Sequence, residues 1–199
     1  MTNYDDIDFS ALDALAEGEV VTHSLVRDIR LPSGKVLALI TLDNGRDHTR
    51  PNTFGPTTLV ELGETLDALA ARAASGEIQA VGVTGKQYIL AAGADLSDIS
   101  RVPSKEVARL VAQLGHKVLG KLSTLGVPSF AFVNGLALGG GLEIALHSTY
   151  RTVDASAAAI ALPEPGADRH RGDLVCRRAG RCPLPSPAGH RGPARVALP

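Results

Sequence analysis

The 199-residue sequence contains no tryptophan, one methionine and two cysteines, and aromatic residues make up only 4% of it. Two cysteines are too few for the disulfide framework of a small secreted domain. No apolar run reaches 18 residues, which argues against a transmembrane helix. The acidic start of the chain has no basic segment followed by an apolar one, so a signal peptide is not expected. These absences predict a cytoplasmic protein with no membrane partner.

An excess of charge of either sign is also missing. The chain carries 20 basic and 21 acidic side chains, a net charge of −1, which gives no reason to expect a nucleic-acid partner. Gly135 and Gly139 are four residues apart, so there is no dinucleotide-binding fingerprint, and residues 84–87 lack two of the residues that define a P-loop. The hydrophobic content of 44% is typical of a globular domain with a sizeable core.

Short apolar runs alternate with helical patterns along most of the chain. Strands are expected at 19–29, 35–42, 78–84, 88–92, 129–133, 150–153 and 159–162, the first two joined as a hairpin. Helices are expected from the leucines at 59–69, ending before Gly76, over 104–124 behind an N-cap at Ser104, and at 142–146. This alternation predicts an α/β architecture in which the turns carry the site. Residues 1–18 show only a weak helical pattern and are expected to be a flexible lead-in.

A glycine-rich turn stands out near the middle of the chain. The strand at 129–133 leads through an Asn-Gly turn to three glycines at 139–141 and then to the helix that carries Glu143. Backbone N–H groups at such a helix start attract negative charge, and glycine lets a ligand approach the main chain. Tight packing, with Glu143 merely complementing the helix dipole, explains the same residues equally well.

A second turn of small residues follows the strand at 88–92. Ala92, Gly93 and Ala94 again leave backbone N–H groups with little side-chain obstruction. Two such turns could aim a pair of N–H groups at one oxygen, which is the arrangement of an oxyanion hole. Taken alone, the segment is equally consistent with an ordinary left-handed turn at Gly93.

In their order along the chain, these elements resemble the crotonase (enoyl-CoA hydratase/isomerase) family. The resemblance covers about residues 20–164 and rests on four elements: the strand at 36–42 with Arg50-Pro51-Asn52 after it, residues 83–85 with 92–96, the segment from Pro128 to Glu143, and Leu162-Pro163-Glu164. The acidic N-terminal extension and residues 147–151 are most similar to the hydratase half of bacterial multifunctional β-oxidation proteins.

The resemblance implies a crotonase-like ββα spiral that binds acyl-CoA thioesters and assembles as trimers or hexamers when the full-length chain is made. By position, the N–H groups of Ala94 and Gly140 would hold the thioester oxygen, and Glu143 and Glu164 would be the catalytic carboxylates. Ala92, Ala94 and Leu96 would line the pocket for the CoA adenine. The implied substrate-binding set is Ala92, Gly93, Ala94, Asp95, Leu96, Gly139 and Gly140. No metal and no cofactor are implied, because coenzyme A is part of the substrate.

Two glutamates favour the hydration of 2-enoyl-CoA in fatty-acid β-oxidation. One carboxylate can act on the water while the other delivers a proton to the α carbon, with Glu164 the expected proton donor and Glu143 orienting or activating the water. Alternatives that stay open are a 3-enoyl-CoA isomerase, which can work with the Pro-Glu carboxylate alone, and other enolate chemistry on CoA thioesters. A further alternative is an inactive remnant that only binds CoA or partner subunits.

The composition changes abruptly at residue 165. Residues 165–199 hold both cysteines, six of the twelve prolines and seven arginines but no lysine, and they do not continue the family pattern. We expect a crotonase-like core at 19–164 that lacks its C-terminal helices, followed by a disordered or frameshifted tail at 165–199. His170, Cys176, Cys182 and His190 match no zinc-binding spacing. A basic nucleic-acid-binding tail is disfavoured because the segment has no aromatic residues.

Overall fold

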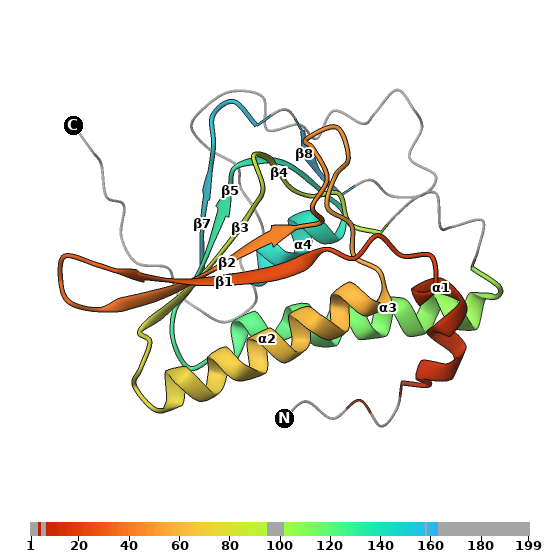
Figure 1. The fold of residues 1–199 in the computed structure, drawn as a ribbon, viewed down its shortest axis with the longest axis horizontal. Coiled ribbons are helices and arrows are strands. Elements are labelled where there is room, and N and C mark those ends of the chain that lie inside the picture. Colours follow the sequence, from red (N-terminus) through yellow and green to blue (C-terminus); the bar gives the residue numbers. More distant parts are fainter. Residues whose placement is uncertain (1–3, 5–6, 95–101, 158, 163–199) are drawn as a thin grey trace.

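The computed structural model describes residues 4, 7–94, 102–157 and 159–162 (Figure 1). The strands are β1 His23–Arg30, β2 Val36–Asp43, β3 Ala80–Gly85, β4 Tyr88–Ala91, β5 Ser129–Val133, β6 Gly135–Leu138, β7 Tyr150–Val153 and β8 Ile160–Ala161. The α-helices are α1 Asp13–Ala16, α2 Pro56–Ala74, α3 Lys105–Gly120 and α4 Gly140–His147, and 3-10 turns η1 and η3 span Phe9–Leu12 and Lys121–Ser123.

Five strands form the larger sheet, in the spatial order β1, β2, β3, β5 and β7. β1 and β2 form an antiparallel hairpin, and every other pairing in the sheet is parallel. Along β2 the alternate residues Ala38, Ile40 and Leu42 are fully buried, which is the period of two expected of a strand with one face against a core. The predicted hairpin is confirmed.

The remaining strands, β4, β6 and β8, form a second sheet that is parallel throughout. After β2 and α2 the chain repeats one pattern: a strand in the large sheet, a strand in the small sheet, then a helix. β3, β4 and α3 make one repeat, β5, β6 and α4 the next, and β7 and β8 begin a third. This is the ββα spiral, so the expected fold class is confirmed for the described residues.

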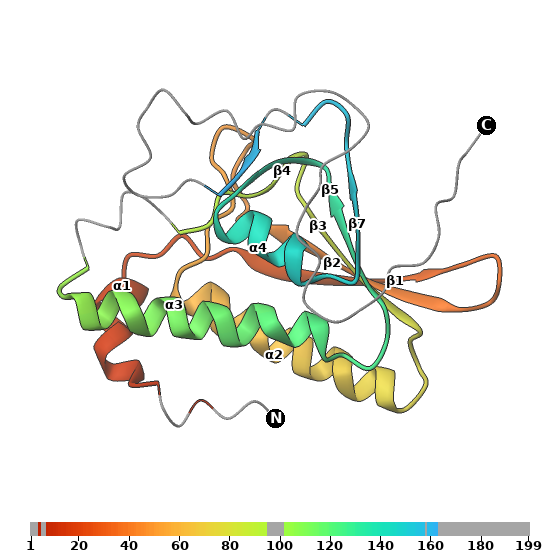
Figure 2. The same ribbon diagram turned by 180° about the vertical axis from the view of Figure 1, so that it is seen from behind.

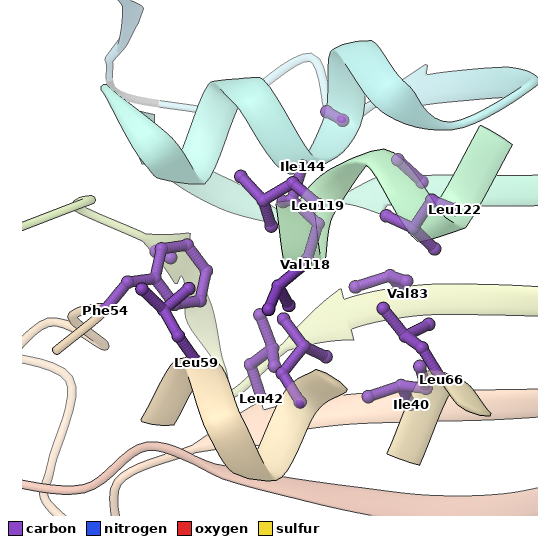
Figure 3. Close-up of a cluster of buried hydrophobic side chains, with 14 of the residues drawn as sticks. Ile40, Leu42, Phe54, Leu59, Leu66, Val83, Val118, Leu119, Leu122 and Ile144 are labelled. Atoms are coloured by element: carbon purple, nitrogen blue, oxygen red, sulfur yellow. The ribbon is translucent and has the colours of Figure 1, made fainter. Parts of the chain in front are cut away.

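Helices α2 and α3 run side by side along one face of the large sheet (Figures 1 and 2). α2 packs directly on the sheet, and α4 contacts α3 on one side and β5 and β6 on the other. The apolar stripe of α2, Leu59, Leu62, Leu66 and Leu69, is at most 2% exposed. Burying one such leucine contributes about 1.5–3 kcal/mol. Figure 3 shows this core, in which Leu66 of α2 meets Ile40 and Val83 of the sheet.

The start of α3 and the end of α2 lie where the sequence predicts them. Ser104 caps α3, because its hydroxyl oxygen accepts the N–H of Val107 at 3.3 Å. Gly76 lies just beyond α2 with a φ of +77°, the left-handed conformation that glycine supplies at helix ends.

The N-terminal segment departs from the expectation of a flexible lead-in. Residues 9–16 form η1 and α1, and Leu12 and Leu15 are only 2% and 5% exposed. Ile7 is buried with them, and all three belong to the main core cluster. Single apolar residues scattered over 16 positions give no clear periodicity, so the sequence alone does not reveal that they pack.

A short strand also interrupts the glycine-rich region. β6 begins at Gly135 and separates Asn134 from the three glycines at 139–141, whereas the sequence suggests one continuous turn. At Asn134 the chain passes from the large sheet to the small one, and its side-chain amide donates to the carbonyls of Gly85 and Lys86 at 3.0 and 2.7 Å. Asn134 thus joins the two places where successive repeats change sheet. Four residues are too few to show strand alternation.

No helix within the described ranges is long and apolar enough to cross a membrane.

Candidate active site

The two small-residue turns leave neighbouring parallel strands of the small sheet. Ala92, Gly93 and Ala94 follow β4, and Gly139 and Gly140 follow β6. Because β4 and β6 are parallel and paired, their carboxyl ends lie at the same edge of the sheet. Ligands of α/β proteins bind at such edges.

The backbones of the two turns are in direct contact. A Cβ added to Gly93 would lie 2.7 Å from the nitrogen of Gly140 and 3.0 Å from the carbonyl oxygen of Leu138. Gly93 also has a φ of +78°, and Gly139 has a φ of +49° with a ψ of −123°, conformations that side chains disfavour. Glycine is therefore required at 93 both for the turn and for the close approach to Gly140.

Hydrogen bonding separates the turn residues into two groups. The N–H of Ala92 donates to the carbonyl of Asn52 at 2.8 Å, and that of Gly139 donates to the carbonyl of Ala161 at 3.0 Å. The N–H groups of Ala94 and Gly140, in contrast, donate to no other backbone group in the described part of the chain. The two N–H groups expected to hold the thioester oxygen therefore have no backbone acceptor among the described residues, and neither does the N–H of Gly93 between them.

Helix α4 begins at Gly140 and carries Glu143 in its first turn. The carbonyl of Gly139 accepts the N–H groups of Leu142 and Glu143 at 2.8 and 3.0 Å, which anchors the helix start to the turn. The Glu143 side chain is exposed, and within the described ranges its carboxylate forms no hydrogen bond or ion pair. A carboxylate beside the positive end of a helix is electrostatically favoured, and this one is open to water.

Three of the expected site residues, Asp95, Leu96 and Glu164, lie outside the described residues. The described chain reaches Leu162, directly after β8, which pairs in parallel with β6. Leu162 therefore lies at the same edge of the small sheet as the two turns. Of the expected adenine-pocket residues, Ala92 is half-buried and Ala94 is exposed at that edge.

Two shallow hollows on the described surface lie elsewhere. One is apolar and is lined by Leu37, Leu39 and Phe132 on the large-sheet face away from the helices. The other lies beside Val133 and Val153 at the ends of β5 and β7. Neither includes a residue of the two turns. No group of three or more potential metal ligands occurs among the described residues.

Sequence reasoning did not assign a role at this site to Phe54 or Lys86. The N–H of Phe54 donates to the carbonyl of Gly93 at 2.8 Å, and its ring lies beneath Gly140, 3.1 Å from an added Cβ. Lys86 holds the loop that precedes Phe54. Neither residue belongs to a recognisable motif, so only the contacts reveal them.

Comparison with known proteins agrees with this geometry. The family model described as enoyl-CoA hydratase/isomerase matches residues 33–167, about two thirds of the chain. The chain belongs to the enoyl-CoA hydratase/isomerase family. The resemblance noted in the sequence is thereby confirmed, and the matched segment contains both turns and α4.

Curated relatives have the same name in several bacteria. The chain is 34% identical over 138 residues to the fatty acid oxidation complex subunit alpha of Shewanella loihica, a match that covers 68% of this chain and 18% of that protein. It is 35% identical over 116 residues to the protein of that name from Pseudomonas savastanoi, covering 57% and 15%. The expected likeness to bacterial β-oxidation proteins is confirmed, although the chain spans less than one fifth of these relatives.

Solved structures show the same fold. DspI from Pseudomonas aeruginosa aligns with a TM-score of 0.56 and 29% identity, covering 71% of this chain and 54% of that one. The enoyl-CoA hydratase of Bacillus anthracis aligns with a TM-score of 0.56 and 25% identity, covering 66% and 48%. The match therefore spans about half of each of these two solved chains.

Proposed function

We propose that this chain adds water to 2-enoyl-CoA thioesters, with the N–H groups of Ala94 and Gly140 holding the thioester oxygen. The observation that carries the proposal is the contact between the turns at Gly93 and Gly140, which sets two available N–H groups beside a helix start. The names of the curated relatives support fatty-acid oxidation as the setting. A cytoplasmic location, and assembly into trimers or hexamers when the full-length chain is made, belong to the same proposal.

The chemistry requires a place for negative charge. When the oxygen of water attacks the β carbon, the electrons of the double bond move toward the thioester carbonyl and give an enolate. Each fixed N–H donor aimed at that oxygen stabilises the transition state by about 3 kcal/mol. The enolate then takes a proton at the α carbon, which completes the 3-hydroxyacyl thioester.

Two carboxyl groups would handle the protons. Glu143 orients the water or takes its proton, and Glu164, as the acid, gives a proton to the α carbon. The pair ends with the same total number of protons, so no external acid or base is consumed. Each positioned group is worth about 10²–10⁴-fold in rate, and two close carboxyls titrate as one coupled pair.

Hydration of crotonyl-CoA by the purified full chain tests the proposal. Glu143→Gln and Glu164→Gln keep the side-chain shape but remove the carboxylate, and each is expected to lower kcat about 10²–10⁴-fold. Glu106→Gln is the matched control, because Glu106 is also an exposed glutamate in the first turn of a helix, α3. Unchanged activity in both site variants would refute the carboxylate assignment. No hydration by the unmodified chain would favour a remnant that only binds CoA or partner subunits.

A 3-enoyl-CoA isomerase is the second candidate, because the matching family includes both reactions. Isomerisation removes a proton from one carbon and returns it to another, so a single carboxylate suffices. With a 3-enoyl-CoA substrate, an isomerase should keep its activity in Glu143→Gln and lose it in Glu164→Gln. A hydratase should lose hydration in both.

Residues 165–199 are tested separately. If another reading frame of the coding DNA after codon 164 continues with an apolar Pro-Gly-x-Gly-Gly segment, the frameshift hypothesis holds. The proposed activity would then be assayed in the restored chain.

A further inference from the structure

The segment 52–54 lies along the exit of β4 and contacts both turns. Its backbone is bridged to that exit by two hydrogen bonds of 2.8 Å, from the N–H of Ala92 to the carbonyl of Asn52 and from the N–H of Phe54 to the carbonyl of Gly93. The Phe54 ring, 5% exposed, packs beneath Gly140. A displacement of this segment would therefore move the Ala94 turn relative to Gly140.

The Asn52 side chain ties the segment to two strands. It is fully buried, and its amide nitrogen donates to the carbonyls of Leu42 in β2 and Leu90 in β4 at 2.8 and 3.0 Å. Its amide oxygen accepts the N–H of Asn44 at 3.1 Å. Both N–H donors and one lone pair of the side chain are thus satisfied inside the protein. Asn52 joins the end of the large sheet to the strand that carries the first turn.

Lys86 holds the loop behind Asn52. Its ammonium group donates to the side-chain oxygen of Asn44 and to the carbonyls of Arg46 and Arg50, the latter two at 2.9 and 2.7 Å. All three N–H donors of the lysine are therefore used. Asn44 in turn donates to the carbonyl of Pro51 at 2.9 Å. The loop has no helix or strand between Asp43 and Pro56, so the lysine replaces the regular hydrogen bonds that it lacks.

We propose that Asn52 and Lys86 are positioning residues for the oxyanion site, with Lys86 fixing the loop and Asn52 fixing the turn that presents the Ala94 N–H. The inference rests on the proposed function. It adds that a lysine and an asparagine outside the two small-residue turns fix the positions of the Ala94 and Gly140 N–H groups, and that they do so through the backbone. Loss of the Lys86 contacts should misplace Ala94 without touching the substrate.

The test compares Lys86→Met with Lys121→Met in the full chain. Lys121 is the control, because it is a buried lysine that, like the half-buried Lys86, donates to a backbone carbonyl, that of Gly63 at 2.9 Å. It also pairs with Asp67 at 2.8 Å, and its contacts join η3 to α2, away from the two turns. We expect Lys86→Met to lower kcat for crotonyl-CoA about 10²-fold, as a misplacement of about 1 Å can do, with a smaller change in KM. Lys121→Met should keep its kcat. Lys86→Arg, which retains a cation with several donors, should recover part of the loss.

A spectroscopic readout separates positioning from mere destabilisation. Isotope-edited infrared spectroscopy of bound butyryl-CoA, which has no double bond to hydrate, reports the thioester C=O stretch. Two oxyanion donors lower that frequency relative to free butyryl-CoA, and Lys86→Met should reverse part of the shift. Asn52→Asp, which keeps the size of Asn52 but lacks both N–H donors, should reverse it as well.

The outcomes distinguish this inference from the proposed function. A carbonyl shift in Lys86→Met equal to that of the unmodified chain overturns the positioning role, even if hydration is confirmed. Equal loss of kcat in Lys86→Met and Lys121→Met also overturns it, because the effect would then be general. If the unmodified chain lowers the C=O stretching frequency of bound butyryl-CoA but does not hydrate crotonyl-CoA, only the proposed function is refuted. An unmodified chain without any shift overturns both.

Discussion

Replacing Gly93 with alanine tests whether contact between the turns creates the donor pair. The added methyl carbon would lie 2.7 Å from the Gly140 nitrogen, closer than real Cβ atoms come, and its three nearest neighbours are backbone atoms that cannot rotate away. The turns must therefore move apart. The methyl group would also cover the Gly140 N–H that the thioester oxygen is proposed to use.

Two free-energy costs determine how much stability Gly93→Ala is expected to lose. Alanine at the Gly93 φ of +78° costs about 1–2 kcal/mol relative to glycine. Forcing a methyl group into a packed contact adds about 1–3 kcal/mol. Gly126→Ala is the matched control, because Gly126 has a φ of +77° but no atom within 4 Å of an added Cβ, so it carries the first term only.

Urea unfolding and crotonyl-CoA kinetics measure the two effects separately. We expect Gly93→Ala to lose about 1–3 kcal/mol more than Gly126→Ala, and to lose about 10²–10³-fold in kcat, the effect of removing one oxyanion donor. Gly126→Ala should keep its kcat. If Gly93→Ala is as active as the unmodified chain, or loses no more stability than its control, the contact at Gly140 does not set the donor pair.

Further expected outcomes concern stability and pH. Ser104→Ala should lower the free energy of unfolding by about 1 kcal/mol through the lost cap of α3, and Ser104→Asp should restore it, both measured in urea. Leu66→Ala should cost about 2–5 kcal/mol, because Leu66 is fully buried between α2 and the large sheet; a loss below 1 kcal/mol would contradict the core described above. The Ser156 hydroxyl and N–H hold the pKa of Asp154 below its usual 3.8. Because the folded pKa is the lower one, this group stabilises the fold above pH about 3.8 and loses that effect as pH falls through the folded pKa. The stability difference between the unmodified chain and Asp154→Asn should therefore shrink on acidification, and a constant difference would be inconsistent with it.

The sequence predicts the elements that repeat strongly and several short strands, but it misses two short elements, β6 and α1. The leucines of α2 and the stripe of α3 show clear helical spacing, and both helices form where that spacing occurs. β6 has four residues and α1 has four, so neither has enough positions to establish a period. The fold class survives these misses, because the alternation of longer elements already specifies it.

The residues of the candidate site also differ in whether the sequence reveals them. Glycines at 93 and 139–141 are visible in a sequence because few other residues suit those turns. The roles of Asn52 and Lys86 are not visible, although Asn52 is part of the family resemblance, since these roles depend on carbonyl groups that the fold brings together from residues 42, 46, 50 and 90. A polar residue gives no sign in sequence of which backbone groups it will meet. Sequence therefore predicts the turns themselves but not the residues that aim them.

The repeat explains why the two turns meet at all. Each ββα unit places its second strand in the small sheet, and successive units lie side by side, so β4, β6 and β8 are parallel neighbours. The residues that leave these strands occupy equivalent positions: Gly93-Ala94 in the first unit, Gly139-Gly140 in the second and Leu162 in the third. Parallel strands in register bring such positions to one edge. An oxygen site made of two N–H groups thus arises from repetition of one backbone pattern. Glycine is needed where adjacent units touch, at Gly93 against Gly140, at Gly135 against Tyr88 and at Gly141 against Ala91.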